Sequence, residues 1–255
     1  MTEGLSLRER KKIQTRRTLW RTAAKLFLER GYDQVSVAEV ALAAEVSKMT
    51  VFNYMSSKED LVLGPMQEHI GDAARSVRDR RPGESAVAAF RRAFMAALHA
   101  HDPSVGMSDD PHVLQMRRLI QETPALLVRA HEYVRRAQML LAEELAAVAE
   151  GPDAELAPVV AAQLMSVRYA VHEYNHRRLF AGESAEAVLP GAVALAERAF
   201  DLVEHGLGDF ATLPAGTEAT EAIEVAEATG VTKATGATGA AAATASAPAT
   251  ETRAE

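Results

Sequence analysis

The chain has 255 residues, no cysteine and a formal net charge of −7. Its length allows one large or two small domains with a proper core, and the missing thiols exclude disulfides, thiolate metal sites and a cysteine nucleophile. No apolar run in the sequence approaches membrane-spanning length, and none follows the basic N-terminus. We therefore expect a cytoplasmic protein without a membrane segment.

Positive charge is concentrated near the N-terminus. Residues 8–25 contain eight Lys or Arg and a single acid, whereas residues 61–206 contain 15 basic and 20 acidic side chains. A local basic surface on an acidic chain indicates an anionic partner at that end.

Helical periodicity recurs along the chain and sustained alternation is absent, so an all-α fold is expected. Ser36-x-x-Glu39 and Ser57-x-x-Asp60 have the pattern of capping boxes, Ser47 is a third N-cap, and Gly31 is a helix stop. The nine expected helices cover about residues 7–30, 37–44, 48–54, 57–81, 85–101, a sixth from 110, a seventh from 123, 157–181 and 184–205.

Two prolines fall beyond the first turn of these expected helices. Pro65 lacks a backbone donor and should kink the fourth helix or loosen its turn, and Pro190 should break or delay the ninth. We hypothesise that a ligand tilts the fourth helix at Pro65. After about residue 210 the composition becomes Ala, Thr and Gly with almost nothing to bury, so residues 211–255 are expected to form a disordered tail.

The second and third expected helices, with the turn at residues 45–47, have the spacing of a helix-turn-helix, which places its second helix in the DNA major groove. Hydroxyl groups of this segment can donate to phosphates, while Asn53 can pair with adenine and Met49 can touch a thymine methyl group. The residues expected to contact DNA are Arg17, Ser36, Ser47, Lys48, Met49, Thr50, Asn53, Tyr54 and Lys58.

A run of short motifs extends over residues 13–62. They are Ala23-Ala24, Leu26-Phe27, Gly31-Tyr32, Ser36-Val37, Val40-Ala41, Val46-Ser47, Thr50-Val51-Phe52-x-Tyr54 and Ser57-Lys58-Glu59-x-Leu61. With these motifs, residues 13–62 resemble the DNA-binding domain of TetR-family transcriptional regulators. That resemblance implies that Thr50, Tyr54 and Lys58 grip phosphates. Glu45, Met49 and Phe52 depart from the pattern, since the family commonly has glycine at the first two positions and tyrosine at the third.

The same resemblance implies a small-molecule pocket in the later helices and a homodimer formed through the last two. The segments RPGES and RRLIQETPALLVRA are similar to TetR regulators grouped with acyl-CoA-like ligand binders. Methionine and aromatic side chains can line an adaptable apolar cavity, although they can equally fill ordinary core. The residues expected to line the pocket are Phe90, Phe94, Met95, His99, Met116, Leu119, Met165, Tyr169 and His172.

Two other classes of protein compete with this interpretation. HEYNH at residues 172–176 matches H-E-x-x-H, which would make a zinc metalloprotease, but the third histidine of the extended motif is missing. An architectural DNA-binding protein would carry positive charge throughout, unlike residues 61–206. We expect no catalytic residue, no cofactor and no metal, and leave open whether HEYNH ever binds a metal.

The sequence thus predicts a helix-turn-helix domain at 7–56, a ligand-binding and dimerisation domain at 57–210, and the tail. The expected function is a dimeric, ligand-responsive transcriptional regulator. It is expected to act as a repressor that binds a palindromic operator and is released by a small acyl-CoA-like or otherwise hydrophobic effector. Repressor and activator are not distinguished by the sequence.

Overall fold

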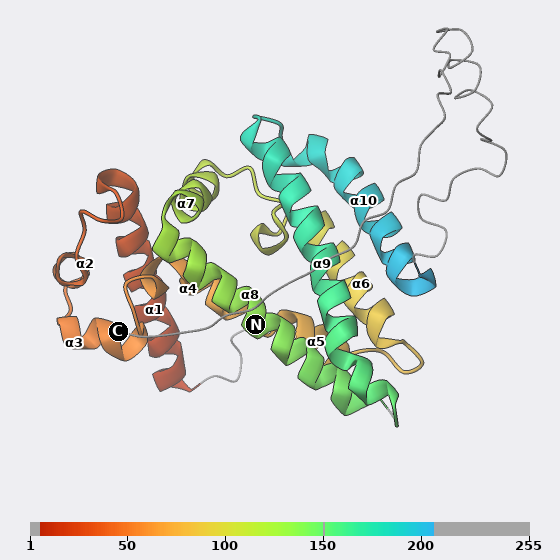
Figure 1. Cartoon of the computed structure of the whole chain (residues 1–255). Helices are drawn as coiled ribbons and strands as arrows, with labels where there is room; N and C mark the ends of the chain where they lie inside the picture. Colours follow the sequence, from red (N-terminus) through yellow and green to blue (C-terminus); the bar gives the residue numbers. More distant parts are fainter. Residues whose placement is uncertain (1–5, 150, 207–255) are drawn as a thin grey trace, which may run out of the picture. The chain divides into compact units, whose positions relative to one another are not determined.

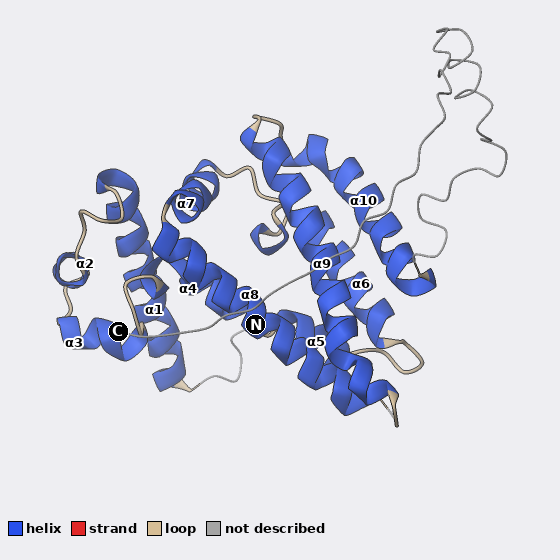
Figure 2. Cartoon of the chain, in the orientation of Figure 1, coloured by secondary structure: helices blue, strands red, loops and turns tan. Residues whose placement is uncertain are grey.

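The computed structural model describes residues 6–149 and 151–206, which fold as helices joined by loops within one compact unit (Figures 1 and 2). This part of the chain contains no strand, so the all-α prediction is confirmed. The predicted disordered tail lies outside the described residues. The helices are α1 (Leu7–Arg30), α2 (Val37–Ala43), α3 (Lys48–Tyr54), α4 (Asp60–His69), α5 (Asp72–Arg78), α6 (Ala86–His99), the 3-10 turn η1 (Pro103–Val105), α7 (Pro111–Glu122), α8 (Pro124–Val148), α9 (Asp153–Phe180) and α10 (Ala185–His205).

Local capping sets the ends of the N-terminal helices. The Ser36 hydroxyl accepts the backbone N–H of Glu39, whose carboxylate accepts the backbone N–H of Ser36 in return. The Ser47 hydroxyl accepts the N–H of Thr50 at 3.0 Å and opens α3. Gly31 ends α1 with φ of 86°. This backbone conformation costs less free energy for glycine than for a residue that has a Cβ atom. These caps confirm the predicted bounds of α1, α2 and α3 to within a residue.

The predicted long fourth helix is wrong, because the chain forms two helices there. The break falls at Ile70 and Gly71, beyond Pro65, which α4 includes in its interior. Glycine weakens a helix by about 1 kcal/mol relative to alanine. The Asp72 carboxylate, 2.6 Å from His69 Nδ1, then lies in the first turn of α5, where negative charge is favoured.

Two other prolines are also accommodated within helices. α9 begins at Asp153, one turn earlier than predicted, and continues through Pro158, and α10 continues through Pro190 without a break. Each proline removes one backbone hydrogen bond. Burial of neighbouring side chains, such as Val188, offsets that loss by about 25 cal/mol per Å² of apolar surface.

Two hydrophobic cores are built from these helices, and α8 contributes to both. The N-terminal core joins α1–α4 to Met116 of α7 and to Leu126 and Tyr133 of α8. The C-terminal core contains side chains of α5, α6, η1, α9 and α10 together with Leu141 and Leu145 of α8. A helix shared by both cores provides a rigid connection between them.

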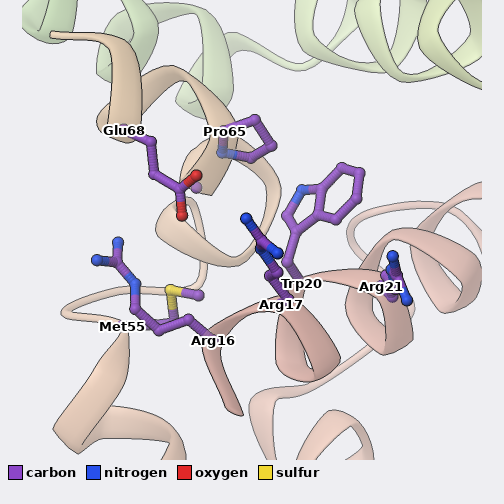
Figure 3. A pocket seen from close by; sticks show the side chains of 8 residues that line it. Arg16, Arg17, Trp20, Arg21, Met55, Pro65 and Glu68 are labelled. Atoms are coloured by element: carbon purple, nitrogen blue, oxygen red, sulfur yellow. The ribbon is translucent and has the colours of Figure 1, made fainter. Parts of the chain in front are cut away.

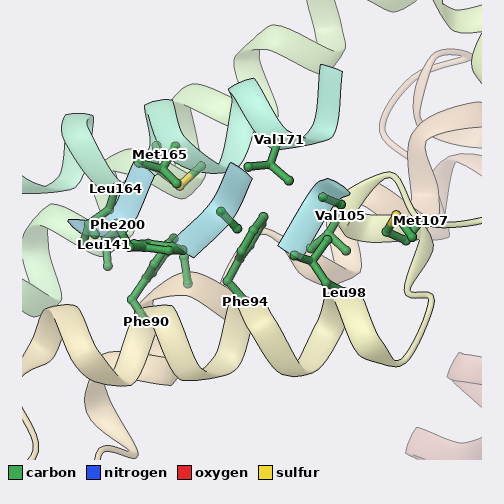
Figure 4. Close-up of a cluster of buried hydrophobic side chains, with 14 of the residues drawn as sticks. Phe90, Phe94, Leu98, Val105, Met107, Leu141, Leu164, Met165, Val171 and Phe200 are labelled. Atoms are coloured by element: carbon green, nitrogen blue, oxygen red, sulfur yellow. The ribbon is translucent and has the colours of Figure 1, made fainter. Parts of the chain in front are cut away.

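The centre of the C-terminal core is aromatic (Figure 4). Phe200 of α10 is fully buried, and its ring packs edge-on against those of Phe90 and Phe94 of α6, at centroid distances of 6.0 and 5.8 Å. Such arrangements add to the stabilisation from burial alone. None of the described helices combines the length and the apolarity that crossing a membrane requires.

Candidate nucleic-acid interface

The turn between α2 and α3 is closed by a residue in the left-handed conformation. Glu45 has φ of 56°, and the backbone N–H of Val46 donates to the carbonyl of Ala41 at 2.9 Å. A side chain in this conformation costs about 1–2 kcal/mol, which glycine avoids. Buried Val40 and Val51 hold α2 against α3. The turn therefore keeps its geometry even though glycine is absent.

The buried Val51 fixes which side of α3 faces outward. Lys48, Met49 and Asn53 are exposed, and Met49 retains 70% of its accessible surface. Among the described residues, the side chains of Lys48 and Asn53 hydrogen-bond no neighbour. Donor and acceptor groups that are free on an exposed helix can reach base edges in a major groove.

Phe52 is a further exposed side chain on α3. Its ring is 44% accessible, and Lys48 Nζ lies 5.9 Å from its centroid, a cation–π contact that orients the ammonium group. Phe52 is not among the DNA contacts that the sequence predicts, where it counts only as a departure from the tyrosine common in the family. The sequence did offer one signal for including Phe52, since it is an aromatic residue next to Asn53 on the predicted recognition helix.

The remaining predicted DNA contacts occupy different environments. The Ser47 and Thr50 hydroxyls lie 2.8 Å apart at the start of α3, whereas the Ser36 hydroxyl caps α2. Tyr54 is half-buried at the end of α3. Lys58 lies in the loop between α3 and α4. Its Nζ is 4.1 Å from the ring centroid of Tyr32, so a cation–π contact holds the ammonium group against the loop between α1 and α2.

Arg17 is exposed on α1 and is not part of the α3 surface. It lines a cleft of about 180 Å³ between α1 and α4, together with Trp20 and Pro65 (Figure 3). The structure therefore brings together Ser47, Lys48, Met49, Thr50 and Asn53 on α3 and places Arg17 in a separate feature.

A buried polar network ties α4 to α8. The carboxylate of Asp60, 1% exposed, accepts hydrogen bonds from the Tyr133 hydroxyl at 2.6 Å and from Arg129 Nε at 3.1 Å. Burial alone would raise the pKa of Asp60, but these hydrogen bonds outweigh it and lower that pKa. Burial and the bond to Asp60 raise the pKa of Tyr133 to about 12. The helix that follows the helix-turn-helix is thus anchored to the helix shared by both cores.

The predicted ligand residues fall into three separate environments. Phe90, Phe94, Met95 and Met165 lie within or against the C-terminal core. Met116 and Leu119 of α7 belong to the N-terminal core instead.

The other three predicted ligand residues lie outside both cores. His99 and Tyr169 are exposed, Tyr169 by 57%, and His172 is half-buried. The structure therefore does not gather the predicted ligand residues around one cavity.

The HEYNH segment lies in α9, facing η1 and α7. Arg117 Nη1 lies 3.0 Å from His172 Nε2. A guanidinium can only donate, so Nε2 accepts and the proton of the neutral ring is on Nδ1, 3.8 Å from the Glu173 carboxylate. Burial is the main cause that lowers the pKa of His176 to about 2, and the nearby His172 and Arg117 act in the same direction.

The donor atoms of His172, Glu173 and His176 lie within 4.8 Å of one another, close enough for a metal ion. The arrangement nevertheless opposes one. A metal would have to displace either the proton on His172 Nδ1 or the Arg117 guanidinium on Nε2. Arg117 also adds positive charge at the site, and burial lowers its own pKa to about 10.

Residues 19–64 match the family model described as bacterial regulatory proteins, tetR family. The chain is also 37% identical over 137 residues to the HTH-type transcriptional regulator TcmR of Streptomyces glaucescens. That match covers 53% of this chain and 59% of TcmR. Residues 19–64 contain α2, α3 and the turn between them, so the helix-turn-helix is the part of the chain that is similar to the tetR family model. The chain spans about three fifths of the length of TcmR.

Solved structures of TetR-family regulators are similar at low identity. One from Streptomyces coelicolor is 21% identical, covers 74% of this chain and 95% of its own, and has a TM-score of 0.45. NalD, the secondary repressor of the MexAB-OprM multidrug efflux pump in Pseudomonas aeruginosa, is 14% identical with coverages of 73% and 96% and a TM-score of 0.48. FadR of Thermus thermophilus, solved with lauroyl-CoA, is 21% identical with coverages of 78% and 98% and a TM-score of 0.43.

Proposed function

We propose that this protein is a cytoplasmic, homodimeric, ligand-responsive transcriptional regulator, most simply a repressor, which reads an operator with α3 and catalyses no reaction. The observation that carries the proposal is the outward face of α3, where Lys48, Met49 and Asn53 are exposed and where, among the described residues, the side chains of Lys48 and Asn53 form no hydrogen bond. Support comes from the tetR-family match over residues 19–64 and from the relative named as an HTH-type regulator.

The proposed division of labour is by position in the sequence, and the N-terminal core extends beyond the first part into α4, α7 and α8. Residues 7–56 would bind DNA, and residues 57–210 would bind the effector and form the dimer. In a dimer, two α3 helices would enter successive major grooves, so the operator should be an inverted repeat with half-sites about one helical turn or a little more apart. Residues 61–206 carry more acidic than basic side chains, which disfavours sequence-independent binding to DNA.

The exposed apolar side chains of α9 support a dimer interface there. Leu156, Val159 and Tyr169 are each more than half exposed on α9, and Leu202 is 37% exposed on α10. Homodimer interfaces are more apolar than the rest of a protein surface. We therefore assign Tyr169 to the proposed dimer surface and no longer to the effector site.

The proposed effector site is the part of the C-terminal core between Phe94 of α6 and Met165 of α9, with the contact between Arg117 and His172 farther along α9. Flexible methionines allow such a core to open around an apolar ligand. Arg117 belongs to α7, whose Met116 and Leu119 pack in the N-terminal core. A ligand that moves α7 would therefore disturb the packing of the DNA-binding helices.

Selection of bound fragments from a random duplex library, followed by footprinting, tests this function. We expect one protected inverted repeat. Uniform, salt-sensitive recovery of all sequences would contradict specific recognition and favour an architectural protein.

Replacing Asn53 with alanine should weaken binding to the selected operator by about 1–3 kcal/mol, roughly 5- to 150-fold, because a bidentate base contact is lost. Binding to a scrambled duplex should change little, since phosphate contacts remain. Fluorescence anisotropy on both duplexes measures the two affinities. Gln34→Ala, an exposed amide before α2, is the matched control. Equal weakening on both duplexes would show that Asn53 does not read bases.

A further inference from the structure

The cleft between α1 and α4 combines positive charge with an aromatic wall (Figure 3). Its volume of about 180 Å³ leaves room for a small oxyanion. Only one acidic side chain, Glu68, faces the three arginines, so the lining carries a net charge of +2. The lining residues are Arg16, Arg17, Trp20, Arg21, Met55, Gly64, Pro65 and Glu68.

The arginines of this cleft differ from many others in the chain in that they do not pair with a carboxylate among the described residues. Arg17 and Arg21 are exposed, and within the described ranges none of the three forms an ion pair. Arg16 donates from Nη2 to Gln67 Oε1 at 2.6 Å, but its Nε is buried and has no hydrogen-bond partner among the described residues. Arginines elsewhere that do pair with a carboxylate include Arg30, Arg78, Arg91, Arg92, Arg129 and Arg178.

We infer that this cleft is a binding site for a phosphate group. A guanidinium offers a planar fork of donors that matches phosphate oxygens, and three such groups around one small cavity can satisfy several oxygens at once. The buried, unpartnered Nε of Arg16 supplies a donor that is already desolvated. The phosphate could belong to the DNA backbone or to a small molecule, since both present the same chemistry.

The cleft lies at the contact between α1 and α4. α1 provides the arginines, α4 provides Gly64 and Pro65, and Met55 ends α3. Trp20 Nε1 already donates to the Val62 carbonyl at 3.2 Å across the same α1–α4 contact. A phosphate in the cleft would be held by the α1 arginines at the place where α1 packs on α4. This goes beyond the proposed function, because it requires neither a specific operator nor the effector.

Trp20 is the single tryptophan of the chain and lines the cleft, so its fluorescence reports occupancy directly. The full chain is titrated with sodium phosphate at constant ionic strength, balanced with sodium chloride, and separately with a duplex of random sequence. The cleft variants are Arg21→Gln and Arg16→Gln. Arg135→Gln, an exposed arginine on α8, removes the same charge elsewhere and is the control.

We expect a saturable change in Trp20 fluorescence that Arg21→Gln and Arg16→Gln each weaken about tenfold, consistent with losing one charge-assisted hydrogen bond, while Arg135→Gln leaves it unchanged. Saturation by inorganic phosphate would identify a small-anion site. Saturation by the duplex alone would identify a backbone-phosphate contact. No saturable change with either probe, or equal responses from the wild type and the cleft variants, would overturn the inference. Because the duplex is random, this result is independent of whether a specific operator exists.

Discussion

Replacing Asp60 with alanine should lower the free energy of unfolding by about 3 kcal/mol. The change removes the acceptor of both Tyr133 and Arg129 and leaves the buried tyrosine hydroxyl without its partner. Urea unfolding followed by Trp20 fluorescence measures the loss, because Trp20 packs against the N-terminal core. Asp33→Ala, an exposed acid in the same part of the chain, is the matched control and should change stability by less than about 0.5 kcal/mol.

The Asp60 carboxylate should also make the free energy of unfolding depend on pH. The folded pKa of Asp60 lies below the ordinary value of 3.8, so its contribution is fully present above about pH 4 and is lost as the pH falls through the lower folded pKa. Asp60→Asn cannot titrate and should show a shallower fall in stability in that range. An unchanged slope would mean that Asp60 is not linked to folding as described.

Replacing Phe200 with alanine should cost about 3–5 kcal/mol, because it leaves a cavity between α6 and α10 beside Phe90 and Phe94. Phe200→Leu keeps most of the volume and is the matched control, with a smaller expected loss. Thermal unfolding followed by far-ultraviolet circular dichroism measures both variants.

The Phe200 variant also tests whether the two cores unfold together. α8 contributes Leu126 to the N-terminal core and Leu141 to the C-terminal core, so we expect Trp20 fluorescence to shift in step with circular dichroism. A Trp20 transition that stays at the wild-type temperature would show that the cores unfold independently. In that case α8 could not carry a signal between them by rigid packing.

Much of the fold could be predicted because its signals are local. Ser36 and Ser47 cap their helices through contacts three residues away, and Gly31 ends α1 through its own backbone conformation. The break between α4 and α5 at Gly71 was not predicted, because a distortion of this helix was expected at Pro65 instead. Pro190 was expected to interrupt a helix that continues, since long-range burial offsets the lost hydrogen bond.

The exposed polar face of α3, which we propose contacts DNA, could be predicted from the sequence for the same reason, because its polar pattern lies within seven residues. The network around Asp60 was not accessible, because Arg129 and Tyr133 lie 69 and 73 positions away. The arginine cleft likewise forms only when α1 packs on α4. Chemical type suggested His99 and Tyr169 as ligand residues, but only the folded chain shows that both are exposed.

The central claim is that α3 reads a specific DNA sequence. Its most direct test is footprinting of the full-length protein on fragments selected from a random library, with Asn53→Ala alongside. If α3 reads a specific sequence, we expect one protected inverted repeat with half-sites about one helical turn or a little more apart. We also expect the variant to lose that protection at concentrations at which the wild type protects. Protection without sequence preference, or protection unchanged by Asn53→Ala, would contradict this claim.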